Sequence, residues 1–150
     1  MDMTRADILE TPSERLELAK RYLSNAKELL NKAGTEEYVG EYLDIKYISE
    51  ASGVAYLSAL EALKALFLWE GLMESAELNE RLKKVEMYDN YLKKLSRVGK
   101  DKDILRRLFR NIYDILHIGG YYRELRDKKA IDSGFEKVEK LVKIVEKYVK

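Results

Sequence analysis

The chain of 150 residues has no cysteine, no glutamine, one proline and one histidine. Without cysteine it can form no disulfide, build no zinc-thiolate site and use no cysteine nucleophile. The lone histidine, His117, cannot supply the several imidazoles of a histidine metal cluster. The eight glycines stand singly or as one pair, so no glycine-rich phosphate-binding loop precedes a predicted helix. The sequence therefore leaves few residues for chemistry, and we predict neither a metal nor a cofactor.

Long uncharged apolar runs are also missing. The longest apolar stretch, Val54 to Trp69, contains Glu61 and Lys64 and is shorter than a bilayer requires. Residues 1–10 alternate charged and apolar side chains and have no hydrophobic core of a signal peptide. We therefore expect a cytoplasmic protein without a membrane span. The abundance of lysine and glutamate, together with the absence of glutamine, is typical of heat-adapted proteins.

Charge is nearly balanced overall, at +1, but the two halves of the chain differ. Residues 1–80 hold 8 basic and 16 acidic side chains, whereas residues 81–150 hold 20 basic and 11 acidic ones. A basic half could form a face that binds a polyanion. Helices packed side by side could equally pair these opposite charges, so segregation along the sequence does not by itself predict a surface patch.

Apolar residues recur at helical spacing along the whole chain, and no stretch alternates as a strand would. Two segments, Thr11-Pro12-Ser13-Glu14 and Ser133-Gly134-Phe135-Glu136, have the form of a capping box that begins a helix. We predict five helices, from Pro12 to before Gly34, from about Asp44 to Trp69, from about Glu77 to Arg97, from Asp101 or Asp103 to Gly119-Gly120, and from Ser133 onward. The predicted fold class is all-α, with residues 1–150 forming one domain, an up-and-down bundle of about five helices.

The candidate for chemistry is the pair formed by Arg110 and His117. Seven residues on an α-helix are two turns less about 20°, so the two side chains should share a face, about 10.5 Å apart along the axis. A fixed cation beside a titratable imidazole is what a phosphodiester-cleaving site could use. The helix dipole near the predicted end would favour a protonated imidazole. The alternative is structural, because a histidine in a last helical turn often hydrogen-bonds the free carbonyls there.

The segment from Arg110 to His117 resembles the signature of HEPN domains, in which an arginine is followed by four to six residues and then a histidine. A small polar residue often follows the arginine, and Asn111 fills that position. Residues 19–30 and 51–66 resemble the first two helices of the family. The resemblance implies a helical bundle that acts as a metal-independent endoribonuclease, usually a homodimer whose motif helices meet at a cleft.

Within this resemblance each residue has an implied role. Arg110 would bind and polarise the scissile phosphate, His117 would be the general acid and base, and Asn111 would orient the phosphate or a neighbour. The ribose 2′-hydroxyl would attack and leave a cyclic phosphate. Many members act as toxins or defence effectors beside a nucleotidyltransferase partner, and many have a tyrosine shortly after the histidine.

Here the next tyrosines, Tyr121 and Tyr122, come only after Ile118-Gly119-Gly120. They could stack on RNA bases while Arg123 and Arg126 contact phosphates, or they could be packing residues. We therefore keep two hypotheses. The first is an RNA-directed, HEPN-like protein that could be an endoribonuclease. The second is a non-catalytic interaction module, in which faces of the second and fourth helices form a homodimer or bind a partner protein.

Overall fold

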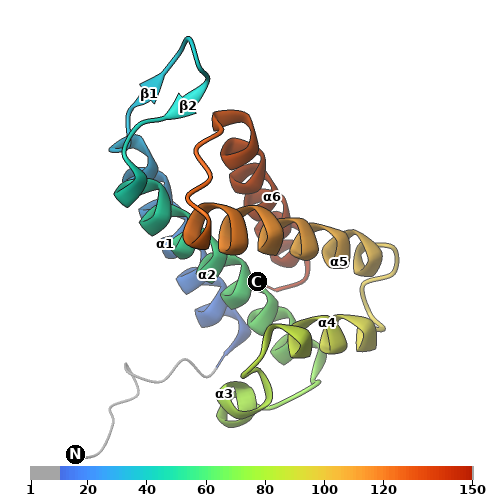
Figure 1. The fold of residues 1–150 in the computed structure, drawn as a ribbon. Coiled ribbons are helices and arrows are strands. Elements are labelled where there is room, and N and C mark those ends of the chain that lie inside the picture. The colour runs from blue at the N-terminus through green and yellow to red at the C-terminus, as the bar shows by residue number, and fades with distance from the viewer. Residues whose placement is uncertain (1–10, 150) are drawn as a thin grey trace, which may run out of the picture.

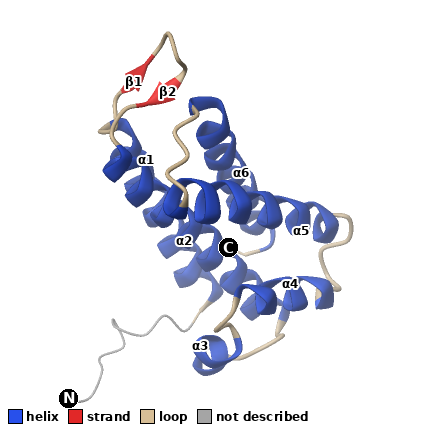
Figure 2. Ribbon diagram, in the orientation of Figure 1, coloured by secondary structure: helices blue, strands red, loops and turns tan. Residues whose placement is uncertain are grey.

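The computed structural model describes residues 11–149, and most of them are helical (Figures 1 and 2). The elements, in chain order, are α1 (Pro12–Asn31), β1 (Thr35–Glu36), β2 (Glu41–Tyr42), α2 (Ile45–Glu70), the 3₁₀ turn η2 (Ser75–Glu77), α3 (Leu78–Arg81), α4 (Val85–Lys94), α5 (Asp101–Ile112), the π-helix η3 (Tyr113–Tyr122) and α6 (Lys128–Tyr148). The predicted all-α fold class is confirmed. Six α-helices occur in the described residues, however, where about five helices were expected.

The helix α2 is the centre of the bundle and packs against α1, η3 and α6. Its alanines let these neighbours approach closely, since the side chains of Ala51, Ala55, Ala59 and Ala62 are fully buried. By length and composition α2 could cross a membrane, but 67% of its most apolar window is buried inside the bundle. Its apolar character is therefore accounted for by its place in the core.

Both α1 and α2 begin beside a capping side chain, and the cap of α1 was predicted. Thr11 and Glu14 form the predicted capping box, in which the Thr11 hydroxyl accepts a hydrogen bond from the Glu14 backbone N–H. Asp44 caps α2 by accepting from the Lys46 N–H. Gly71 ends α2 in the left-handed conformation, with φ of 79°. The second predicted helix is thus confirmed to within a residue at each end.

The third and the last predicted helices differ from the structure in their extent. The third predicted helix is divided into α3 and α4, because Leu82 leaves the helical conformation (φ −114°, ψ 47°) although the residues around it favour a helix. The last helix begins at Lys128, where the Asp127 carboxylate accepts from the Ala130 N–H, and not at Ser133. Gly134 lies within α6, where a Cβ would stand 2.7 Å from a Leu116 methyl group. This glycine allows close packing against η3 and does not begin a helix.

The connector between the first two helices contains a hairpin that the sequence did not predict. Its strands pair antiparallel, with Thr35 opposite Tyr42 and Glu36 opposite Glu41. The hairpin is held to the loop before α6 and to the first residue of α6, because the Tyr42 N–H donates to the Arg126 carbonyl at 2.9 Å and the Lys128 N–H donates to the Gly40 carbonyl at 2.8 Å. It projects from one end of the helical bundle (Figure 1).

Candidate functional site

The segment after α5 is a π-helix and not the expected end of an α-helix. Its hydrogen bonds run from residue i to i+5, so each turn contains more residues than an α-helical turn. The glycine pair lies inside this helix, which continues to Tyr122. Gly120 lies against α2 so closely that a Cβ would be 2.1 Å from the Ser52 hydroxyl oxygen. The predicted role of Gly119-Gly120 as a helix terminus is therefore wrong, and Gly120 serves close helix packing.

The π-helix also changes where Arg110 and His117 lie. A wider turn rotates the chain less per residue, so the α-helical phase that would place both on one face is lost after Ile112. Arg110 lines a hollow of about 370 Å³ with Asp89 and Arg106. His117 lines another hollow, of about 600 Å³, among α1, α2 and η3. In a single chain the two side chains therefore line different hollows.

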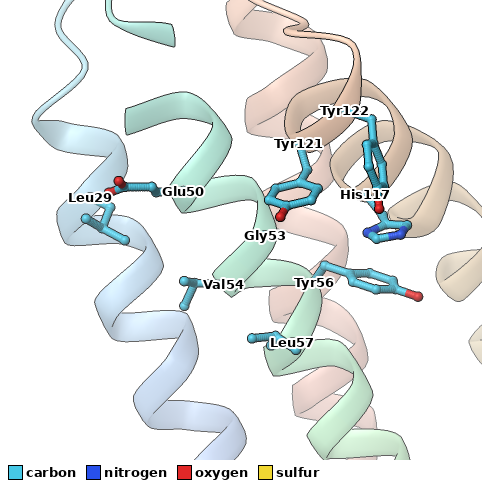
Figure 3. Close-up of a pocket in the computed structure, with 9 residues that line it drawn as sticks. All are labelled: Leu29, Glu50, Gly53, Val54, Tyr56, Leu57, His117, Tyr121 and Tyr122. Atoms are coloured by element: carbon cyan, nitrogen blue, oxygen red, sulfur yellow. The ribbon is translucent and has the colours of Figure 1, made fainter. Parts of the chain in front are cut away.

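We call the second of these the tyrosine hollow (Figure 3). It is lined by residues of α1 and α2 and by three rings of η3, namely Leu29, Glu50, Gly53, Val54, Tyr56, Leu57, His117, Tyr121 and Tyr122. Its volume falls in the range of small-molecule pockets, about 300–1,000 Å³. Glu50 is the only acidic or basic side chain other than His117 in this lining, so its surface is largely apolar.

Four tyrosine rings surround the imidazole of His117. Tyr56 of α2 stacks on it with ring centroids 4.5 Å apart, and Tyr122 meets it edge-on at 5.1 Å. Tyr113 lies at 5.2 Å and Tyr121, nearly parallel to the imidazole, at 6.0 Å. In a π-helix the residues four and five positions onward both lie near the starting side chain, which explains how His117 contacts two consecutive tyrosines.

Burial among these rings lowers the pKa of His117 below its ordinary value of 6.5. No hydrogen bond to the imidazole occurs among residues 11–149 that could stabilise the cation. The expectation that a helix dipole favours a protonated imidazole is wrong, because the helix extends five residues beyond His117. The lowered pKa favours the neutral imidazole, which can donate one hydrogen bond and accept another.

The α2 wall of the hollow depends on a glycine. A Cβ on Gly53 would be 3.2 Å from Cδ1 of Tyr121, so only glycine lets that ring lie against the helix backbone without a shift. The Ser49 hydroxyl donates to the Tyr121 carbonyl at 3.3 Å and ties the end of η3 to α2. Leu57, Tyr121 and Tyr122 are nevertheless exposed, by 42%, 46% and 64%. The hollow therefore offers uncovered apolar and aromatic surface.

The remaining predicted site residues lie elsewhere. Arg110 is exposed and takes part in no ion pair within the described part of the chain, whereas its neighbour Arg106 pairs with Asp89 at 3.1 Å. Asn111, Arg123 and Arg126 line neither hollow. In residues 11–149 no three His, Asp or Glu side chains gather as a metal site would require.

Sequence reasoning missed several residues of the hollow, above all Tyr56 of α2. One signal was available. Tyr113, His117 and Tyr121 recur at every fourth position, a spacing that drifts around an α-helix but keeps rings adjacent when the turns are wider. Nothing in the sequence predicts the contacts of Leu57 or Leu29.

Comparison with known proteins gives a family and a structural relative, and none of the curated proteins matches the chain. The solved structure of a protein of unknown function from Dyadobacter fermentans is similar, with a TM-score of 0.72 and 30% sequence identity. The match covers 91% of this chain and 98% of that one. A family model described as a domain of unknown function, DUF5618, matches residues 14–147. The chain therefore belongs to the DUF5618 family.

Proposed function

We propose that the protein is a non-catalytic helical interaction module that forms a homodimer through the tyrosine hollow. The observation that carries this proposal is the uncovered apolar surface of Leu57, Tyr121 and Tyr122 around one concave site. Exposed apolar side chains gathered in this way mark interaction sites more often than isolated ones do. The hollow joins faces of α2 and η3, which correspond to the second and fourth predicted helices.

The chemistry of the hollow supports protein binding over catalysis. The cores of protein interfaces are rich in tyrosine and poor in lysine and glutamate, and a few aromatic residues in such pockets dominate the affinity. Here four tyrosines surround the imidazole of His117, whose pKa is lowered by burial, and Glu50 is the only carboxylate in the lining. Arg110, the cation that phosphodiester cleavage would need, opens onto the other hollow.

The test is the oligomeric state of the full chain. We expect sedimentation of the wild-type protein between 1 and about 100 μM, the range of ordinary interface affinities, to give a dimer. Leu57→Glu should give a monomer with unchanged helicity, because Leu57 is exposed and its loss opens no cavity. Ala76→Glu, which adds the same charge at an exposed residue of η2, is the matched control and should leave the dimer intact. A wild-type chain that sediments as a monomer throughout would refute the proposal.

An RNA-directed, HEPN-like function is the second candidate, and one observation favours it. Tyr121 and Tyr122 are exposed rings on which unpaired bases could stack, and exposed Arg123 follows them directly. Metal-independent cleavage by Arg110 and His117 would require a second copy to bring its Arg110 to the hollow of the first. A nucleotidyltransferase-type partner protein is expected only under this second candidate function.

RNA binding and cleavage can be measured together. Incubation with mixed RNA in EDTA should give His117-dependent cleavage if the catalytic form of this candidate is right, and none in His117→Ala. If the protein only binds RNA, affinity should fall with added salt and in Tyr122→Ala. Neither cleavage nor salt-sensitive binding is expected from a pure self-association module, so either result would favour the second candidate.

A further inference from the structure

The exposed large apolar side chains of this protein gather in two places. Within the described part of the chain there are six of them, and three lie at the tyrosine hollow. The other three, Tyr38, Val39 and Leu43, lie on or beside the β1–β2 hairpin. Tyr38 at the tip is fully exposed (101%), so it does not pack against the hollow of its own chain. A protruding aromatic tip and a concave aromatic site thus occur on one molecule.

The tip is held in place before any partner arrives. Besides the two backbone hydrogen bonds to the loop before α6 and to the first residue of α6, Glu41 forms a bridge with Asp127, and the Tyr42 hydroxyl hydrogen-bonds the Asp132 carboxylate. The Tyr38 N–H donates to the Glu36 carboxylate at 3.2 Å. A protrusion ordered in this way loses little conformational entropy when it binds.

The charges of the tip and of the hollow's surroundings are complementary. The tip carries three carboxylates within six residues, from Glu36, Glu37 and Glu41. Two lysines lie near residues of the hollow. Lys32 comes three residues after Leu29, directly after the end of α1, and Lys46 lies one turn before Glu50 on α2. Their ammonium groups converge on the Tyr47 ring, at 6.0 and 5.5 Å from its centroid. Arg123 adds a cation directly after Tyr122.

We propose that Tyr38 and Val39 of one copy insert into the tyrosine hollow of a second copy, and that the second copy does the same in return. This insertion rests on the self-association proposed above, and it identifies the segment that occupies the tyrosine hollow. The hairpin follows α1 within a few residues, and Leu29 and Lys32 lie at that same end of α1, so the tip and the hollow are neighbours at one end of the bundle. Reciprocal insertion closes as a twofold dimer, in which each copy contributes both parts.

Reciprocal insertion predicts complementation between two defective variants. A tip variant, Tyr38→Ser with Val39→Ser, keeps its hollow, and the hollow variant Leu57→Glu keeps its tip. Each variant alone should associate at least tenfold more weakly than wild type. A mixture should form a heterodimer with one intact insertion at concentrations where each variant alone is monomeric. Fluorescently labelled hollow variant titrated with unlabelled tip variant measures this directly, and all three changed side chains are exposed, so both variants should fold.

The charges give a second measurement. Glu37→Lys and Lys46→Glu should each weaken the dimer, and the two changes combined in one chain should restore part of the loss. The outcomes separate the two proposals. If Leu57→Glu is monomeric while the tip variant dimerises like wild type, the hollow is the interface but the hairpin is not its occupant. A mixture that forms no heterodimer also overturns the insertion. A monomeric wild-type chain refutes both proposals.

Discussion

Gly120 lies directly against Ser52 of α2, and its replacement by alanine tests the packing of the π-helix. The new methyl carbon would be 2.1 Å from Oγ and 2.6 Å from Cβ of Ser52, which is fully buried, and 3.3 Å from a methyl carbon of buried Ile131. Overpacking of this kind costs about 1–3 kcal/mol. At about 2 kcal/mol, and about 2–4 °C per kcal/mol for a chain of this size, Tm should fall by about 4–8 °C.

The assay is thermal and urea unfolding of wild type, Gly120→Ala, Ser52→Gly, the double variant and a control variant. Because Ser52→Gly removes both the Oγ and the Cβ that the new methyl group would meet, Gly120→Ala should cost almost nothing in that background. Gly53→Ala is the matched control, since its nearest neighbour is the partly exposed ring of Tyr121 at 3.2 Å, which can move. If Gly120→Ala is as stable as Gly53→Ala, or if Ser52→Gly gives no relief, the packing argument is wrong.

Two further predictions concern charged groups. Since burial holds the pKa of His117 below 6.5, the unfolded chain takes up this proton first as the pH falls. The contribution of His117 to the free energy of unfolding should therefore be constant above pH 6.5. It should decrease as the pH falls through 6.5 toward the pKa of the folded state. His117→Phe should lack that decrease, and an imidazole NMR titration midpoint at or above 6.5 would contradict it. Glu61 binds Arg15 at 3.0 Å and Lys64 at 2.9 Å, with all three side chains at most 16% exposed. Glu61→Gln should cost about 3 kcal/mol in urea unfolding, because it leaves two poorly solvated cations without their carboxylate. Glu77→Gln, which breaks the exposed pair with Arg81, should change little, and equal losses in the two variants would rule this out.

Much of the fold could be predicted because local signals and the apolar pattern agree. The Thr11 capping box, the Asp44 cap and the long apolar face of α2 all indicate the elements that the structure contains. The hairpin was missed because its strands are two residues long and depend on contacts with residues 126–128, far away in the sequence. Ser133-Gly134-Phe135-Glu136 has the form of a helix start, but Asp127 provides an earlier cap.

The candidate site was only partly predictable, for a reason that lies in helix geometry. His117, Tyr121 and Tyr122 could be selected from composition and position, and the structure brings them together. Their joining with Tyr56 and their separation from Arg110 depend on an i→i+5 hydrogen-bond pattern. The same segment lies close against α2, as Gly120 does against Ser52, and no spacing rule for α-helices contains such a tertiary contact.

The π-helix also bears on how relatives of this chain should be compared. A π-helical segment holds more residues over the same length than an α-helix does. A single insertion or deletion between Tyr113 and Tyr122 can therefore change the helix type locally while both ends of the segment stay in place. Such a change would rotate a different side chain onto the ring of Tyr56. Equivalent residues in DUF5618 proteins are therefore better assigned by which ring stacks at the Tyr56 position than by counting residues from Arg110.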